Sequence, residues 1–320
     1  MSVYPLTLRF VLGMMLGIGM ASAADFPTKP IRIIASPPGG ANDFVARLVA
    51  QGLNESVGWN VIVENRPSGG FIQGDLLAKS APDGHTLLVA AGSFTIGPLF
   101  EKAPYDVIND FAPVILTSTA PSVLSVHPSM PVTSVRQLIA LAKKRPGQLN
   151  FSTSGTGSAN HLPAELFKAM AGVNIVRINY KGAGPALTAL IGGEVHLMFA
   201  TANSVAPHIQ SGRVRGLAIT SANPSELIPG LPTIASAGVP GYDYESPWGI
   251  LAAARTPPAI VKRLNQEIAR VIRQPDVRKR FMDTGAELVA STPEGYAAVI
   301  KAEQAKWSKV IREAGLAKQP

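Results

Sequence analysis

The sequence alternates short apolar runs with segments in which apolar residues recur at helical spacing. The run from Ile31 to Ala35 predicts a buried strand, and a Pro/Gly-rich turn follows at residues 37–40. The next segment predicts a helix whose apolar face carries Val45, Leu48, Val49 and Leu53. The pattern then repeats, with further strands predicted at residues 61–63, 87–89, 114–116, 123–126, 149–151, 175–178, 197–199 and 217–219.

Helical patterns between many of these runs imply crossover connections, which join parallel strands. The sequence therefore predicts an α/β fold with largely parallel sheets, and about nine strands suit two sheets better than one. Segments rich in Pro, Gly and Ser at residues 125–131 and 238–247 mark candidate boundaries. We therefore expect one lobe formed by residues 24–125 and 246–320 and a second lobe formed by residues 126–245.

Two C-terminal helices are predicted within the first lobe. One opens at Pro257-Pro258, and the other follows Pro293 and carries an apolar stripe that includes Trp307. A stripe at helical spacing is typical of a core-facing helix, so we expect Trp307 to be buried rather than to bind a partner.

The first 23 residues have the three-part order of a secretory signal peptide. A segment with one cationic side chain, Arg9, precedes an almost wholly apolar run from Phe10 to Met20, and small residues form a cleavage site after Ala23. A short membrane anchor is the alternative, but this run is shorter than the ~20 residues that a bilayer span needs. We therefore expect an exported protein that begins near Ala24 and works outside the inner membrane.

Composition narrows the functional classes. A content of 46% hydrophobic and 16% charged residues excludes a disordered chain. The net charge is +8, but the basic residues are scattered without the interleaved aromatics of a nucleic-acid groove, so no nucleic-acid partner is expected. The absence of cysteine excludes disulfides, thiol nucleophiles and thiolate metal sites.

Motifs for catalysis are mostly missing. No His-Glu-x-x-His, Gly-x-Ser-x-Gly or phosphate-loop motif occurs, and the five histidines never come at metal-ligand spacing, so neither a metal nor a cofactor is expected. One enzymatic hypothesis stays open, a secreted hydrolase in which Ser154 or Ser158 is activated by His161. The sequence provides no third group nearby to orient the histidine.

Several loops rich in small hydroxyl residues and glycine follow predicted strands. They lie at residues 36–43, 91–95, 152–160 and 201–204. Such loops converge on one crevice at the carboxyl ends of parallel strands, where the N–H groups of helix N-termini suit an anion. Their hydroxyls either cap the following helix or meet a ligand, and Asp43 is expected to cap the first helix.

The mature sequence resembles one family over nearly its whole length. The motifs that carry the resemblance include Pro37-Pro38-Gly39-Gly40-Ala41-Asn42-Asp43, Val63-Glu64-Asn65-Arg66-Pro67, Gly155-Thr156-Gly157-Ser158, Asn179-Tyr180-Lys181-Gly182 and Ala237-Gly238-Val239-Pro240-Gly241-Tyr242. In this order, after a signal peptide, they resemble the periplasmic solute-binding receptors of tripartite tricarboxylate transporters, called Bug or TctC-like receptors.

The resemblance implies a two-lobed periplasmic-binding-protein fold (type II, Venus flytrap) with a mostly parallel sheet in each lobe. It implies a monomeric receptor that catalyses no reaction, closes over a small carboxylate and delivers it to membrane permease subunits. The ligand-binding residues carried over, or expected near the cleft, are Gly39, Gly40, Ala41, Asn42, Asp43, Phe71, Ser93, Thr153, Ser154, Thr156, Ser158, His161, Tyr180, Thr201 and Asn203.

The sequence also gives expectations about the ligand, the site and the function. Phe71 stands where relatives commonly have glycine, and it either packs in the protein or stacks on an aromatic ligand. Thr201 stands where relatives often have aspartate, which makes an amino-acid ligand less favoured because a buried ammonium would lack its partner. The expected site contains only neutral donors, so binding should weaken only modestly with salt. A sensory co-receptor that signals instead of transporting is the alternative function.

Overall fold

The computed structural model describes residues 26–39, 41–67 and 71–313. The predicted signal peptide and the site residue Gly40 lie outside these residues. Among the described residues, no helix combines the length and the apolar character needed to cross a bilayer.

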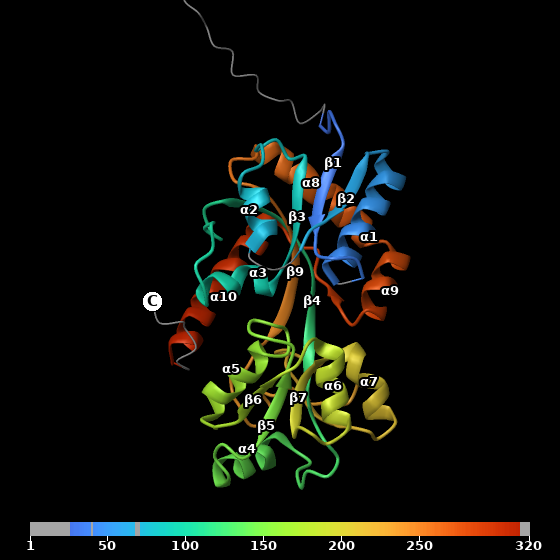
Figure 1. Cartoon of the computed structure of the whole chain (residues 1–320). Helices are drawn as coiled ribbons and strands as arrows, with labels where there is room; N and C mark the ends of the chain where they lie inside the picture. The colour runs from blue at the N-terminus through green and yellow to red at the C-terminus, as the bar shows by residue number, and fades with distance from the viewer. Residues whose placement is uncertain (1–25, 40, 68–70, 314–320) are drawn as a thin grey trace, which may run out of the picture.

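The chain folds into two lobes that share two long strands (Figure 1). In the first lobe, parallel strands pair in the order β2, β1, β3, and the antiparallel strands β9 and β4 continue the sheet. The bounds are β1 Ile31–Ala35, β2 Val61–Asn65, β3 Thr86–Ala91, β4 Phe111–Val126 and β9 Glu245–Ala253.

Strand β4 passes from one lobe into the other. Its first part pairs with β9 up to the pair Pro121 and Glu245, and from Ser122 onward it pairs with β7 and β8. The second-lobe sheet continues from β7 to the parallel strands β5 and β6. The bounds are β5 Asn150–Thr153, β6 Val176–Asn179, β7 Leu197–Thr201 and β8 Arg215–Ile219, and the short β10, Glu287–Leu288, pairs with β4.

Helices cover both sheets (Figure 1). Those of the first lobe are α1 Ala41–Val57, α2 Ile72–Ala78, α3 Gly92–Ile96, the 3₁₀ turn η2 Gly97–Leu99, α8 Pro258–Ile272, α9 Pro275–Asp283 and α10 Pro293–Glu313. Those of the second lobe are α4 Val135–Lys144, α5 Leu162–Ala171, α6 Ala183–Ile191 and α7 Ala202–Gln210. The apolar face predicted for α1 is buried, as periodicity requires.

Helix α10 belongs to the cores of both lobes. Tyr296 and Ile300, near its start, pack in a first-lobe cluster, whereas Trp307 packs with second-lobe residues such as Phe151. Trp307 is fully buried and lies edge-on to Tyr244, with ring centroids 6.0 Å apart. The prediction that its stripe faces the core is confirmed, but the helix is a third connection between the lobes rather than a first-lobe element alone.

Two sequence predictions about strands are wrong. The runs predicted at residues 114–116 and 123–126 are parts of the single strand β4, and β9 was not predicted. Pro121 interrupts the apolar pattern within β4, and Pro247 and Gly249 do so within β9. The exact lobe limits expected at residues 125/126 and 245/246 stay predictions.

Candidate functional site

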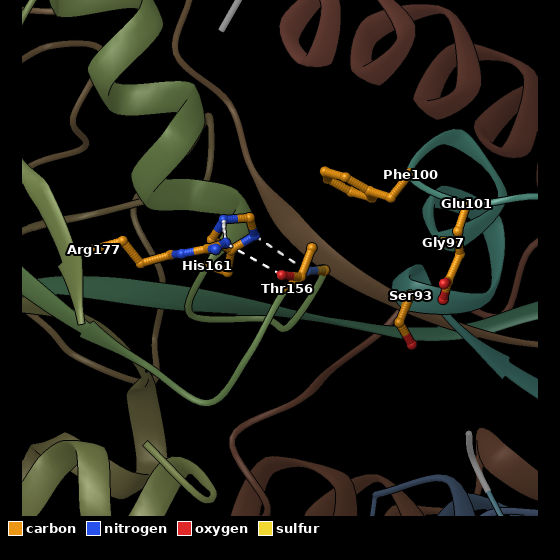
Figure 2. Close-up of a pocket in the computed structure, with 8 residues that line it drawn as sticks. Ser93, Gly97, Phe100, Glu101, Thr156, His161 and Arg177 are labelled. Carbon is orange, nitrogen blue, oxygen red and sulfur yellow. Dashed lines mark hydrogen bonds between the residues drawn. The ribbon is translucent and has the colours of Figure 1, made fainter. Parts of the chain in front are cut away.

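A cavity of about 390 Å³ lies between the lobes. Ser93, Gly97, Phe100 and Glu101 line it from α3, η2 and the residues that follow, all in the first lobe. Thr156, Gly157, His161 and Arg177 line it from the second lobe. Figure 2 shows these two groups of side chains on opposite sides of the cavity.

A second cavity of about 290 Å³ adjoins the first. The two share Ser93, Gly97, Glu101 and Thr156, so together they form one interlobe cleft. The second cavity extends into the first lobe, where its lining includes Ser36, Asn42, Phe71, Gln73, Phe94 and Tyr105.

Arg177 brings a positive charge to this cleft from β6. Its guanidinium Nη1 lies 2.7 Å from His161 Nε2 and 3.3 Å from Thr156 Oγ1 (Figure 2). Both contacts are with uncharged groups, and no carboxylate lies within ion-pair distance of Arg177 among the described residues. A half-buried guanidinium with no carboxylate of a described residue at ion-pair distance is suited to bind a carboxylate.

His161 is fully buried and cannot accept from both of its neighbours. Burial, followed by the charges of Arg177 and Lys168, lowers the pKa of His161 to about 3, so the ring is neutral at physiological pH. A neutral imidazole accepts at one nitrogen only. The backbone N–H of Gly157 donates to Nδ1 at 3.1 Å while Arg177 approaches Nε2, and both neighbours are donors. Only one of these two donors can be accepted, and the Glu165 carboxylate also lies 3.7 Å from Nε2.

The hydroxyl-rich loop after β5 is tied to itself. Thr153, Ser154 and Ser158 donate their hydroxyl hydrogen bonds to the side-chain oxygen of Asn160, at distances between 2.6 and 3.3 Å. These hydroxyls do not cap α5 and line no described cavity, and their expected contact with a ligand stays a prediction. These hydrogen bonds tie together the loop from which Thr156 lines the cleft.

The first loop is held from within α1. Asp43 lies in the first turn of that helix, and its carboxylate accepts from the Gly39 N–H at 3.0 Å, Arg47 Nε at 3.0 Å and Asn65 Nδ2 at 2.7 Å. The predicted N-cap role is wrong, because the carboxylate turns back to the preceding loop. Burial opposes the charge, but these hydrogen bonds dominate and hold the pKa of Asp43 below its ordinary value.

Asn42 is also bonded within the protein. Its amide donates to the Val89 carbonyl at 3.1 Å and accepts from Trp248 Nε1 at 3.1 Å. Asn42 lines the interlobe cleft, whereas Trp248 lines a separate cavity of about 310 Å³ together with Gly39, Ala41 and Asn203. The residues expected in one site are therefore divided between two cavities that meet at the Asn42–Trp248 pair.

Tyr180 and Thr201, like Asp43 and the three tied hydroxyls, line none of the described cavities. The Tyr180 hydroxyl lies 3.4 Å from Glu194, and the Thr201 hydroxyl donates to Ser204 at the start of α7. The structure thus assembles Asn42, Phe71, Ser93, Thr156 and His161 in the interlobe cleft.

Comparisons with known proteins identify the family of this two-lobed chain. The profile of the tripartite tricarboxylate transporter family receptors, TctC, matches residues 45–316. The chain belongs to this receptor family. Among its curated relatives, protein BugT of Bordetella pertussis is 39% identical, over 93% of this chain and 94% of BugT.

Solved relatives share the receptor's fold. The R. palustris protein Rpa4515, solved with adipate, is 37% identical with a TM-score of 0.78, and the match covers 92% of this receptor and 99% of Rpa4515. MatC from Rhodopseudomonas palustris, solved with bound malate, is 29% identical with a TM-score of 0.75, covering 89% and 100% of the two chains. Family members are periplasmic solute-binding proteins with two lobes.

The receptor is not an enzyme, and its geometry disagrees with the hydrolase hypothesis. The Ser158 hydroxyl contacts the Asn160 side-chain oxygen and the Gly155 carbonyl, while the His161 ring contacts the Gly157 N–H and Arg177, so no hydroxyl of a described serine bonds to the imidazole. In the described part of the chain, no group of three or more His, Asp or Glu side chains is arranged to hold a metal ion.

Sequence reasoning missed Arg177, Tyr105 and Phe100 as cleft residues. Arg177 interrupts an otherwise apolar predicted strand at residues 175–178, a signal that could have drawn attention to it. Tyr105 and Phe100 follow η2 in an irregular segment without periodicity, where no sequence pattern indicates which side chains turn inward.

Proposed function

We propose that this receptor binds a small carboxylate in the interlobe cleft and delivers it to the permease of a tripartite tricarboxylate transporter. The observation that carries the proposal is the guanidinium of Arg177, which has no carboxylate partner among the described residues and lies in a cavity lined from both lobes. An anion that contacts both lobes stabilises the closed form, because those contacts exist only after closure.

Besides Arg177, the cleft is lined by neutral hydrogen-bond donors and by the carboxylate of Glu101. Ser93 and Thr156 offer hydroxyls from opposite lobes, and Asn42 lies at the first-lobe end. Glu101 lines the same cavity beside Ser93, across from Arg177 (Figure 2). A ligand carboxylate is therefore expected on the Arg177 side. The relatives solved with adipate and malate support dicarboxylates as the first ligands to test.

The cellular part of the proposal rests on the family and on the N-terminal sequence. In this proposal, the signal peptide at residues 1–23 exports the chain and is cleaved after Ala23. The exported protein is a monomer whose first lobe is formed by residues 24–125 and 246–320 and whose second lobe is formed by residues 126–245. This monomer meets the permease. Uptake of the labelled acid should disappear when the receptor gene is deleted. Normal uptake with loss of acid-induced gene expression would instead support the sensory alternative.

Thermal unfolding of the chain from Ala24 onward tests ligand binding. The panel contains mono-, di- and tricarboxylates, acidic amino acids, nicotinate and benzoate-type acids. A ligand at about 100 times its dissociation constant adds about 2.7 kcal/mol to the free energy of unfolding, which raises the midpoint by several degrees. We expect at least one carboxylate to do so and the amino acids to fail. A flat panel, with no acid found by mass spectrometry of the denatured protein, would contradict the proposal.

A further inference from the structure

Tyr105 and Arg177 lie at different ends of the interlobe cleft. Arg177 lines the first of the two adjoining cavities but not the second, and Tyr105 lines the second but not the first. The residues that both cavities share, which include Ser93 and Thr156, lie between them. A ligand that reaches both ends must therefore be elongated.

The Tyr105 hydroxyl is a donor on a mostly buried side chain that lines the cavity. The residue is only 8% exposed. Desolvation raises the pKa of Tyr105 far above its ordinary value, so the hydroxyl keeps its proton. Buried tyrosine hydroxyls usually have a hydrogen-bond partner, and a cavity is the place where a ligand supplies one.

An aromatic wall surrounds this hydroxyl. The ring of Tyr105 stacks on Phe94, with centroids 5.1 Å apart and planes at 12°, and it meets Phe71 edge-on at 5.8 Å. All three rings line the cavity. They offer apolar surface to the body of a ligand, whereas a hydroxylated body would lose its hydration there.

The backbone makes room for these rings. A Cβ added to Gly74 would lie 2.3 Å from Tyr105 Cε1, and one added to Gly97 would lie 3.1 Å from Phe71 Cε1. Phe71 itself has a φ of 61°, a left-handed conformation that is unfavourable for an aromatic residue. A strained residue on the wall of a cavity points to a role in binding rather than in packing alone.

We propose that Tyr105 is a specificity-determining residue that donates a hydrogen bond to the far polar end of an elongated acid. One carboxylate of the ligand lies at Arg177, its apolar body lies against Phe71 and Phe94, and its second acidic group accepts from Tyr105. This inference rests on the proposed function and narrows the ligand to diacids with an apolar or aromatic body.

Two matched pairs of acids test the inference by titration calorimetry. Adipate and hexanoate share a six-carbon body, and terephthalate and benzoate share a ring, but only the first of each pair has a second carboxylate. We expect the native receptor to bind at least one diacid about tenfold more tightly than its monoacid, because a hydrogen bond to a charged group is formed at Tyr105. In Tyr105→Phe, binding of the diacid should weaken by about tenfold and binding of the monoacid by less than about twofold.

Tyr296→Phe is the matched control, since it removes the hydroxyl of another buried tyrosine that lines no described cavity and should change neither affinity. Tyr105→Phe keeps the ring, so its unliganded melting midpoint should equal that of the native receptor. Equal losses for diacid and monoacid, no loss, or no binding of either diacid would overturn the inference. The proposed function would still stand if a shorter carboxylate bound in an Arg177-dependent way, and a flat panel with no retained acid would contradict both.

Discussion

Replacing Arg177 with glutamine removes the one cationic side chain that lines this cleft among the described residues. A hydrogen bond to a charged group contributes about 1.5–3 kcal/mol, which corresponds to about 10–150-fold in affinity. Arg177 is half-buried and already contacts His161 and Thr156, so the lower part of this range applies, and we expect a loss of about 10–30-fold. The unliganded protein should be about as stable as the native one, because the substitution removes one of two donors that compete for the single acceptor of His161.

Titration calorimetry with the best ligand of the panel measures this loss. Arg145→Gln is the matched control, because Arg145 is exposed, lines no described cavity and carries the same charge. Raising the salt concentration from about 50 to about 500 mM should weaken binding to the native receptor and to Arg145→Gln, but have little effect on Arg177→Gln. Equal affinities of the two variants would refute the role assigned to Arg177.

Three further predictions concern the framework of the site. The native protein should lose about 2 kcal/mol of stability between pH 7 and pH 5 through His161, because the lowered pKa of the folded state means that the unfolded chain binds the proton first. His161→Gln should flatten this part of the pH profile of urea unfolding. An unchanged slope would contradict the lowered pKa of His161. Asn42→Ala should lower the free energy of unfolding by about 1–3 kcal/mol in the same assay, since it leaves the Trp248 indole N–H without its acceptor. A variant as stable as the native protein would contradict this structural role of Asn42. Trp307→Ala should cost about 3–5 kcal/mol because the ring is fully buried against Tyr244, and a loss below about 1 kcal/mol would show that α10 is not anchored in the second lobe.

Local sequence patterns predicted most of the elements but not how the lobes are joined. Strand β1 and helix α8 begin and end close to where periodicity and the prolines place them, because each buries one continuous apolar run or face. Strands β4 and β9 cross between the lobes and contain Pro121 and Pro247. Their pairing is fixed by contacts between distant segments, and the sequence pattern of one strand carries no signal of its partner.

The site was predicted at the level of loops rather than of side chains. The loops that contain Ser93 and Thr156 do reach the cleft, as expected for loops at the ends of parallel strands. The hydroxyls of Thr153, Ser154 and Ser158 instead bond to the side-chain oxygen of Asn160. The sequence pattern does not indicate this local network. The sequence predicted a site with neutral donors only, and so it missed Arg177. Which way the Arg177 side chain points depends on the register of β6 against β5, which the sequence of β6 alone does not show.

A crystal structure of the receptor with the acid that most raises its melting midpoint would test the central claim most directly. We expect the acid between the lobes, with one carboxylate within hydrogen-bond distance of the Arg177 guanidinium and with contacts to Ser93 and Thr156 from opposite lobes. An acid bound elsewhere, for example in the cavity lined by Gly39 and Asn203, or bound in the cleft without contact to Arg177, would contradict the account.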